Sequence, residues 1–326
     1  MTEKSNFNLD TARKAGKIHY HIRNEILEWI QPNMKYIDIC ERIETRIKEL
    51  TNYSIDYPLQ GGIAFPTGVS SNHCAAHWTP NPCDKKMFIS KNDICKIDYG
   101  VHLNGIIVDS AFTVSFDSKY DNLLEASRTS TELGIKLSGP DAVLSDIGKE
   151  IQENLESYEI ELEGKTYLIK SIKDLTGHQI EPYKIHARKR VPNFYLENYK
   201  ERMEEDEFYA IETFASTNYT KVSHGKDCSH FMLNYDIDYQ KIPLANKDKK
   251  LLYQIEKYFG TLAFCNRWLH DLKINRYEHN LKTLIKNNVV TKYPPIYDNI
   301  NSYVAQFEHT IYINSTGNEV ISRPNI

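Results

Sequence analysis

Residues 94–114 read ICKIDYGVHLNGIIVDSAFTV, with an Asn-Gly pair between two apolar, strand-like segments. An Asn-Gly pair in this position is the strongest short-range signal of a β-hairpin with a two-residue turn. That turn would set Asp98 opposite Ala111 and make Asp109 the diagonal neighbour of Asp98 on one face of the sheet. Two carboxylates so close together among isoleucines and valines repel each other unless something neutralises them. The stretch therefore predicts an antiparallel sheet that carries an unusual acidic site.

An internal repeat at an offset of 108 residues surrounds this hairpin. Residues 31–47 (QPNMKYIDICERIETRI) align without a gap with residues 139–155 (GPDAVLSDIGKEIQENL). Each segment follows an amphipathic helical stretch, at residues 11–30 and 122–137, which ends near a proline. Chance similarity between two amphipathic helices is the alternative explanation. The pattern predicts two related halves, each with a pair of helices followed by strands.

The second half offers strand patterns of its own. A hairpin is expected at residues 158–169, turning at Glu163-Gly164, and further strands at residues 207–216 and 304–313. Between His230 and Tyr293 lies a polar stretch rich in Lys, Asn and Tyr, with helical segments expected at 250–272 and 278–287. This stretch has no counterpart in the first half. We interpret residues 231–292 as a helical insertion subdomain within a single domain, residues 1–326.

Composition excludes several classes of protein. The 326 residues include 40 Lys and Arg against 44 Asp and Glu, a net charge of −4, so neither nucleic acid nor an anionic membrane is expected as the main partner. The sequence contains no apolar run long enough to span a membrane and no signal peptide pattern near its start, which predicts a cytoplasmic protein. Six scattered cysteines without CxxC or Cys/His pairing fit neither a disulfide framework nor a zinc knuckle.

The second half repeats the acidic anomaly of the hairpin. Glu212 lies within YAIETF and Glu308 within AQFEHTI, each at the centre of an apolar strand pattern. For any single carboxylate, an exposed position at a sheet edge is the simpler explanation. If all four converge, two divalent cations would balance their charge, and oxygen-rich ligation with one imidazole suits Mn, Fe, Co or Zn. Two such ions can hold and acidify a bridging water, so we infer a dinuclear hydrolytic centre.

Three of the twelve histidines stand in suggestive contexts. His178 follows a glycine that permits close backbone approach, His186 lies eight residues further on, and His77 ends the run NHCAAH. A lone histidine is more often a surface or structural residue than a catalytic one. The residue pattern alone therefore leaves their roles open.

Seven motifs together show a close resemblance to the type 2 methionine aminopeptidases, over residues from about Thr11 to Arg323. They are GGIAFPTGVSSNHCAAHWTPN, ICKIDYGVHLNGIIVDSAFTV, LTGHQIEPYKIH, RMEEDEFYAIETFAS, DCSHFM, FGTLAFCNRWL and YPPIYDNINSYVAQFEHTI. The resemblance implies an α/β pita-bread fold, with two pseudo-symmetric halves around a dinuclear metal site and a helical insertion. It also implies a metal-dependent hydrolase that removes the initiator methionine from nascent proteins and peptides when the second residue is small.

The same resemblance implies the residues of the site. Asp98, Asp109, His178, Glu212 and Glu308 would be the metal ligands, with Asp109 and Glu308 bridging both ions. Catalytic roles fall to Glu212 and to two further histidines: His186 would stabilise the oxyanion, and His77 would contact the scissile amide or its leaving nitrogen. The substrate pocket would be formed by Phe65, His77, Ile185, His186, His230, Ala263 and Tyr293.

Three residues depart from the family pattern. Thr176 stands where the family commonly has Asn, and Glu181 and Arg188 stand where a glycine or another small residue is usual. Two other functions compete with the aminopeptidase: a proline-specific pita-bread peptidase such as prolidase or aminopeptidase P, and a non-catalytic pita-bread binding protein. The first should lack the insertion and the apolar pocket, and the second should lack a ligand. We expect a monomer whose partners are peptides with an N-terminal methionine.

Overall fold

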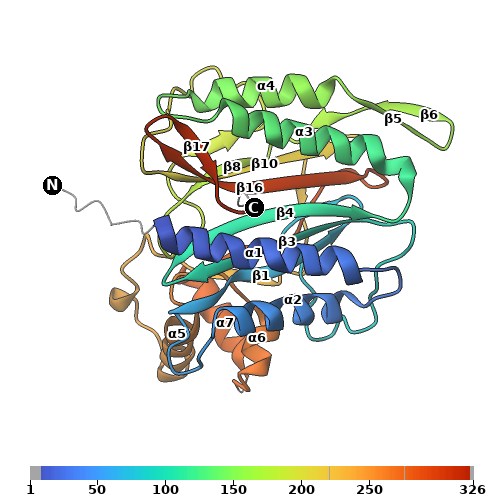
Figure 1. The fold of residues 1–326 in the computed structure, drawn as a ribbon. Helices are drawn as coiled ribbons and strands as arrows, with labels where there is room; N and C mark the ends of the chain where they lie inside the picture. Colours follow the sequence, from blue (N-terminus) through green and yellow to red (C-terminus); the bar gives the residue numbers. More distant parts are fainter. Residues whose placement is uncertain (1–8, 220, 275, 324–326) are drawn as a thin grey trace.

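The computed structural model describes residues 9–219, 221–274 and 276–323; residues 1–8, part of the N-terminal stretch considered above, lie outside the described residues. The first half is a three-stranded antiparallel sheet in the order β1-β3-β4 with two helices against it (Figure 1). Its elements are α1 (Leu9–Trp29), α2 (Tyr36–Leu50), β1 (Gly61–Ser71), β2 (Cys74–Ala76), β3 (Ile94–Leu103) and β4 (Ile106–Ser115). The predicted hairpin is confirmed as β3 and β4, with Asp98 opposite Ala111 and Gly100 opposite Asp109.

The second half has a larger sheet in the order β17-β16-β10-β8-β9, with β7 also paired to β10. Its elements are η1 (Ser118–Tyr120), α3 (Asp121–Leu137), α4 (Leu144–Glu156), β5 (Glu159–Leu162), β6 (Lys165–Leu168), β7 (Lys170–Ser171), β8 (Thr176–Ile180), β9 (Arg190–Pro192), β10 (Phe208–Ser216), β16 (Val304–Asn314) and β17 (Gly317–Val320). The expected hairpin at 158–169 and the strands at 207–216 and 304–313 are confirmed as β5–β6, β10 and β16.

The sequence repeat corresponds to two equivalent helix pairs. Helices α1 and α2 pack on the first sheet and α3 and α4 on the second, and both pairs lie on the same face of the molecule, in front of the strands (Figure 1). The repeated apolar positions of α2 and α4 are all buried: Ile39, Ile43 and Ile47 in α2, and Ile147, Ile151 and Leu155 in α4. Because these positions recur every four residues, each helix turns one apolar stripe toward its own sheet. The two α/β halves expected from the repeat are therefore present.

The two halves meet along a seam between β4 and β16, which lie side by side (Figure 1). Two threonines bridge this seam. The Thr310 hydroxyl donates to the carbonyl of Asp109 at 2.6 Å and accepts from its N–H at 2.8 Å. The Thr113 hydroxyl makes the same pair of bonds with Gln306, at 2.7 and 2.8 Å. Side-chain hydroxyls thus satisfy backbone groups that would otherwise be buried without a partner.

A third region follows β10 and forms one end of the molecule (Figure 1). Its elements are β11 (Ser223–His224), β12 (His230–Leu233), η2 (Tyr239–Lys241), α5 (Asn246–Phe259), β13 (Phe264–Cys265), α6 (Asn266–Asp271), α7 (Tyr277–Lys286), β14 (Val290–Tyr293) and β15 (Ile296–Tyr297). The sheets are ordered β13-β12-β14 and β11-β15-β2. The helix expected at 278–287 corresponds to α7. The continuous helix expected at 250–272 is wrong, because Gly260 has a φ of 55° and ends α5, and β13 intervenes before α6.

A buried ion pair joins this region to the first half. Both carboxylate oxygens of Glu44, on α2, accept from the Arg267 guanidinium of α6 at 2.7 and 2.8 Å, and one also accepts from the Trp268 indole at 2.8 Å. The bidentate geometry with an added indole donor satisfies a charge that would be very unfavourable alone in the core. In the described part of the chain, no helix is both long enough and apolar enough to cross a membrane.

Candidate metal centre

One cavity of about 390 Å³ contains every residue that the sequence nominated for the site. Its walls come from both halves and from the third region. The nominated residues that line it are Phe65, His77, Asp98, Asp109, His178, Ile185, His186, Glu212, His230, Ala263, Tyr293 and Glu308. Residues as far apart in sequence as Phe65 and Glu308 therefore face one space.

The four carboxylates stand on the strands at the seam between the two sheets and on the strands next to it. Asp98 is on β3 and Asp109 on β4, while Glu212 on β10 lies directly opposite Glu308 on β16. The His178 Nε2 atom lies 3.5 Å from Asp109 Oδ2 and 4.0 Å from Glu212 Oε1. Like charges placed directly opposite each other destabilise a sheet, so this arrangement needs a compensating positive charge.

Burial and mutual repulsion both disfavour the ionised carboxylates. Burial raises the pKa of Asp109 to about 8. Burial, and then the neighbouring Asp109, raise the pKa values of Asp98, Glu212 and Glu308 well above their usual range. Groups that would carry four negative charges have thus been removed from water and placed together, which is costly in the absence of a cation.

The polar atoms left without partners fit divalent metal ions. Among the described residues, Asp98 Oδ1 and Asp109 Oδ1 are buried without a hydrogen-bond partner. Asp109, His178 and Glu308 each offer one ligand atom, and these three atoms lie within 4.8 Å of one another, close enough to bind a single ion. Carboxylate oxygens with one imidazole are the donor set of Mn, Fe, Co or Zn. The site therefore suits divalent cations in both charge and donor chemistry.

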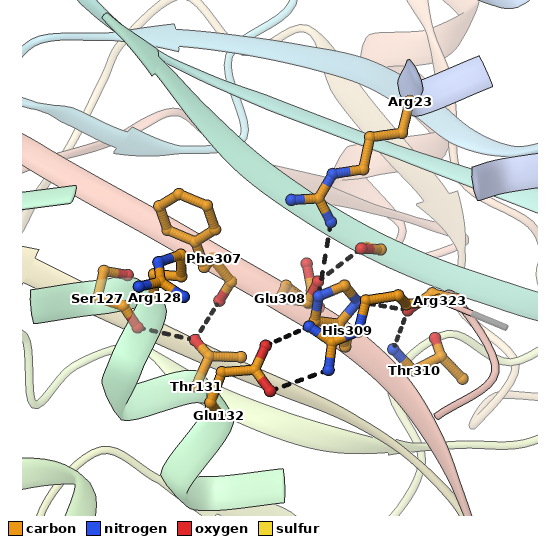
Figure 2. Close-up of polar contacts among 12 residues, drawn as sticks. Arg23, Ser127, Arg128, Thr131, Glu132, Phe307, Glu308, His309, Thr310 and Arg323 are labelled. Atoms are coloured by element: carbon orange, nitrogen blue, oxygen red, sulfur yellow. Dashed lines mark hydrogen bonds and ion pairs between the residues drawn. The ribbon is translucent and has the colours of Figure 1, made fainter. Parts of the chain in front are cut away.

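Both neighbours of Glu308 on β16 are tied to helices, as Figure 2 shows. The carbonyl of Phe307 accepts from the Thr131 hydroxyl of α3 at 2.9 Å. On the other side, the His309 ring contacts the Arg23 guanidinium of α1, with Nε2 at 3.5 Å from Nη1. The carbonyl of Glu308 itself accepts from the Ser110 hydroxyl of β4 at 2.5 Å. These contacts fix the strand on both sides of Glu308 and so position the residue that carries the carboxylate.

The glycine before His178 has the close approach that the sequence suggested. A Cβ on Gly177 would lie 2.5 Å from the backbone oxygen of Ala210 on β10, so only glycine fits there without a backbone shift. β8 can therefore pair closely with β10, with His178 opposite Ala210. That pairing brings the imidazole to the carboxylates.

Four imidazoles surround the carboxylates or continue the cavity wall. The ring centroid of His186 lies 4.5 Å from that of His178, at an edge-on angle of 89°, and the His77 centroid lies 6.1 Å from that of His230. Burial lowers the pKa of His77 and of His186 to about 3, with a further contribution from neighbouring imidazoles. Near pH 7 each ring is neutral and offers one N–H donor. His77 also has a φ of 62°, a strained conformation for a non-glycine residue that is common at functional sites.

Part of the cavity wall is apolar. Phe65, Ile185 and Ala263 line it together with Met232, and the His77 ring lies edge-on to Tyr293 at 6.0 Å between centroids. Met232 was not predicted from the sequence, although it lies two residues from His230 on β12 and so shares its face of the strand. The cavity thus combines an acidic floor, formed by the four carboxylates, with apolar walls.

Comparison with known proteins places this chain in a family. Residues 10–233 match the model of metallopeptidase family M24. The chain belongs to metallopeptidase family M24. Within that family it belongs with the type 2 methionine aminopeptidases. It is 45% identical over 314 residues to methionine aminopeptidase 2A of Arabidopsis thaliana, covering 96% of this chain and 70% of the relative. It is also 45% identical over 315 residues to methionine aminopeptidase 2 of Saccharomyces cerevisiae strain YJM789, covering 95% and 74%.

Solved structures confirm the pita-bread fold expected from the sequence. A thermophilic Arx1 matches with a TM-score of 0.83 at 19% identity, covering 98% of this chain and 91% of that one. A methionine aminopeptidase from Thermotoga maritima matches with a TM-score of 0.65 at 20% identity, covering 98% of each chain. At such identities these two likenesses establish the fold of this M24 peptidase and nothing about its substrates.

One polar residue of this M24 site escaped the sequence analysis. The Gln306 side-chain amide donates to Glu212 Oε2 at 3.1 Å and lies 3.5 Å from Asp98 Oδ2. Gln306 stands two residues before Glu308 on β16, so strand alternation puts both on one face, and that signal could have found it. Of the departures from the family pattern, Thr176 and Arg188 line the cavity.

Proposed function

We propose that this chain removes the initiator methionine from the N-terminus of nascent proteins and peptides when the second residue is small. The observation that carries the proposal is the single cavity that is lined by both the acidic cluster and apolar side chains. Membership in the type 2 methionine aminopeptidases supports the same activity. The enzyme is a metal-dependent hydrolase, as its family requires.

Asp98, Asp109, His178, Glu212 and Glu308 are the proposed metal ligands. The support is their convergence in one cavity and the buried carboxylate oxygens without partners. A divalent metal centre would supply the acidification of a water molecule and the polarisation of the scissile carbonyl. The amide N–H of Gln306 fixes the orientation of the Glu212 carboxylate.

Three residues then act on the substrate and its protons. His186 offers a neutral N–H to the oxygen of the scissile carbonyl, where negative charge develops. His77 hydrogen-bonds the scissile amide or its leaving nitrogen. Glu212 accepts a proton from the attacking water on a carboxylate oxygen and returns it to the leaving nitrogen.

The shape of the cavity accounts for the proposed substrate preference. A methionine side chain is flexible and polarisable, so it fills an irregular pocket lined by Phe65, Ile185 and Ala263. A charged first residue would lose its hydration there without gaining a partner. A bulky second residue would crowd His77 and His186 and displace the scissile carbonyl, and a shift of about 1 Å can cost roughly 10²-fold in rate.

A peptide panel tests this function against its two competitors. Metal-replete enzyme would be assayed on Met-Ala-Ser, Met-Val-Ser, Met-Lys-Ser, Leu-Ala-Ser and Ala-Pro-Ser. We expect Met-Ala-Ser and Met-Val-Ser to be cleaved far faster than the rest. Rapid cleavage of Ala-Pro-Ser would support a proline-specific peptidase instead. No cleavage of any peptide would support a binding protein.

Variants separate the proposed ligands from the other catalytic residues. Glu308→Ala should lose both activity and bound metal, because the remaining carboxylates repel one another. His77→Ala should lower kcat by roughly 10²-fold while its metal content, measured by elemental analysis, stays near wild type. Loss of metal from the His77 variant would show that this residue is a ligand.

The proposal also covers the identity of the metal, the cellular compartment and the oligomeric state. The ions would be Mn, Co, Fe or Zn, and metal analysis of protein purified without added metal would identify them. We also propose that the chain acts as a cytoplasmic monomer in one catalytic domain, with residues 231–292 inserted. The Glu44–Arg267 pair supports the single domain, since it ties that segment to the first half. Sedimentation would test the monomer.

A further inference from the structure

Two arginines stand at the mouth of the cavity, one just before β9 and one at its first residue. Arg188 and Arg190 both line the cavity and are both exposed. Lys189, between them, faces the opposite way and is buried, with its ammonium 2.9 Å from Glu204 and 2.7 Å from Glu207. The two arginines thus line the cavity, whereas the ammonium between them is held by Glu204 and Glu207.

Arg190 is placed beside the metal centre by the sheet itself. It is paired directly with His178 in the β8–β9 ladder. Residues directly opposite each other in an antiparallel pair share one face of the sheet, with Cβ atoms about 5 Å apart. The same face turns His178 toward the carboxylates, so the Arg190 side chain begins next to a proposed ligand and extends to the rim.

The charge of Arg190 is available to a ligand. Among the residues that the structure describes, no carboxylate lies within ion-pair distance of its guanidinium. Arg188 lies 3.0 Å from Glu201, but both side chains are well exposed, and such pairs exchange readily. The remaining charged residue of the mouth, Asp174, accepts from the Tyr219 hydroxyl and the backbone N–H of Val222, each at 3.1 Å.

The cavity therefore has the proposed metal ligands on its floor and a basic rim. In the proposed function, the scissile carbonyl of the peptide lies at the metal centre on the floor. An extended peptide advances roughly 3.3 Å per residue, so its third residue lies about 7 Å beyond the scissile carbonyl, within reach of a long arginine side chain at the rim. A carboxylate carried at that position would meet a fork-shaped donor suited to bidentate binding.

We infer that Arg190, supported by Arg188, forms a subsite for a carboxylate at the third residue of the peptide. The carboxylate can be the side chain of Asp or Glu, or the C-terminus of a tripeptide. This inference rests on the proposed aminopeptidase function. It extends that function by adding a preference along the chain beyond the methionine and the small second residue.

Matched peptides test the subsite on the metal-loaded enzyme. Met-Ala-Glu-Ser, Met-Ala-Gln-Ser and Met-Ala-Lys-Ser, all with amidated C-termini, isolate the side-chain carboxylate. Met-Ala-Ser as the free acid and as the amide isolates the terminal carboxylate. We expect Glu to exceed Gln by about 5-fold in kcat/KM, mostly through KM, and high salt to remove the difference. Lys should be the slowest of the three.

Variants then assign the preference to the rim. Arg188→Gln/Arg190→Gln should bring the ratio of Glu to Gln peptide to about 1, and Arg188→Glu/Arg190→Glu should favour the Lys peptide. Arg128→Gln, which changes an exposed arginine on α3, should keep the wild-type ratio. Metal content measured in each variant would reveal a merely structural effect on β8, which would lower the rates on all peptides together.

The outcomes of these assays distinguish failure of the subsite from failure of the aminopeptidase function. Cleavage of Met-Ala-Gln-Ser amide with no preference for Glu, or a preference that persists in the double Gln variant, would overturn the subsite and leave the aminopeptidase function standing. Failure to cleave any of these methionine peptides would overturn the function, and the subsite with it.

Discussion

Replacing Thr310 with valine should weaken metal binding although this side chain is not a ligand. The hydroxyl holds both backbone groups of Asp109, and valine keeps its shape while removing both hydrogen bonds. An unsatisfied buried donor or acceptor costs about 1–3 kcal/mol, so the free energy of unfolding of the metal-free protein should fall by about 3 kcal/mol. Metal affinity should fall roughly 10- to 100-fold, the usual effect of removing a group that supports a ligand.

The assay compares Thr310→Val with Thr310→Ser. Urea unfolding followed by fluorescence gives the stability of the metal-free proteins, and titration calorimetry with Mn²⁺ gives the affinity. Serine keeps the hydroxyl and loses one methyl group, so it should cost only about 1 kcal/mol and bind metal like the wild type. Wild-type affinity in the valine variant, or equal losses of affinity in both variants, would refute the idea that Thr310 positions Asp109.

Three further predictions follow from burial and packing. Glu44→Gln leaves the Arg267 charge buried and should reduce the urea-derived free energy of unfolding by about 3–5 kcal/mol, whereas a double replacement of the pair by Leu and Met should recover most of it. Gly100→Ala places a methyl group against the Phe65 ring and should raise KM for methionine peptides roughly tenfold, with little change in metal content. Burial raises the pKa of Asp109 from 3.8 to about 8. In the metal-free protein, the contribution of Asp109 to stability is therefore complete below pH 3.8 and is lost as the pH rises through 8. Melting temperatures measured from pH 5 to 9 should fall accordingly, and added metal should remove the trend.

Local signals were sufficient for much of the fold. The turn at Asn104-Gly105 fixed the register of β3 and β4, because a two-residue turn leaves one pairing available. The acidic residues were visible because carboxylates at the centre of apolar strands violate the expected pattern. The break between α5 and α6 was missed, although Gly260 carried a standard signal for the end of a helix.

Other features depend on contacts between distant segments, which one sequence cannot reveal. His178 became a candidate ligand only through family resemblance. A single histidine in a five-residue strand has no local sequence pattern that identifies it as a metal ligand. The bonds of Thr310 to Asp109, and the pairing of Arg190 with His178, join strands that only the folded chain brings together.

The paired bridges of Thr113 and Thr310 bear on how such a chain could have arisen. Thr113 lies four residues after Asp109 on β4, and Thr310 lies four residues after Gln306 on β16. Thr310 bonds Asp109, which lies four residues before Thr113, and Thr113 bonds Gln306, which lies four residues before Thr310. The two bridges are therefore equivalent by position. In a symmetric dimer a contact from one residue to a second is always returned from the second to the first. Two copies of a single ancestral half would have formed both bridges with one threonine. Joining the copies into one chain would have allowed the two bridged residues to diverge, one into the proposed ligand Asp109 and the other into Gln306.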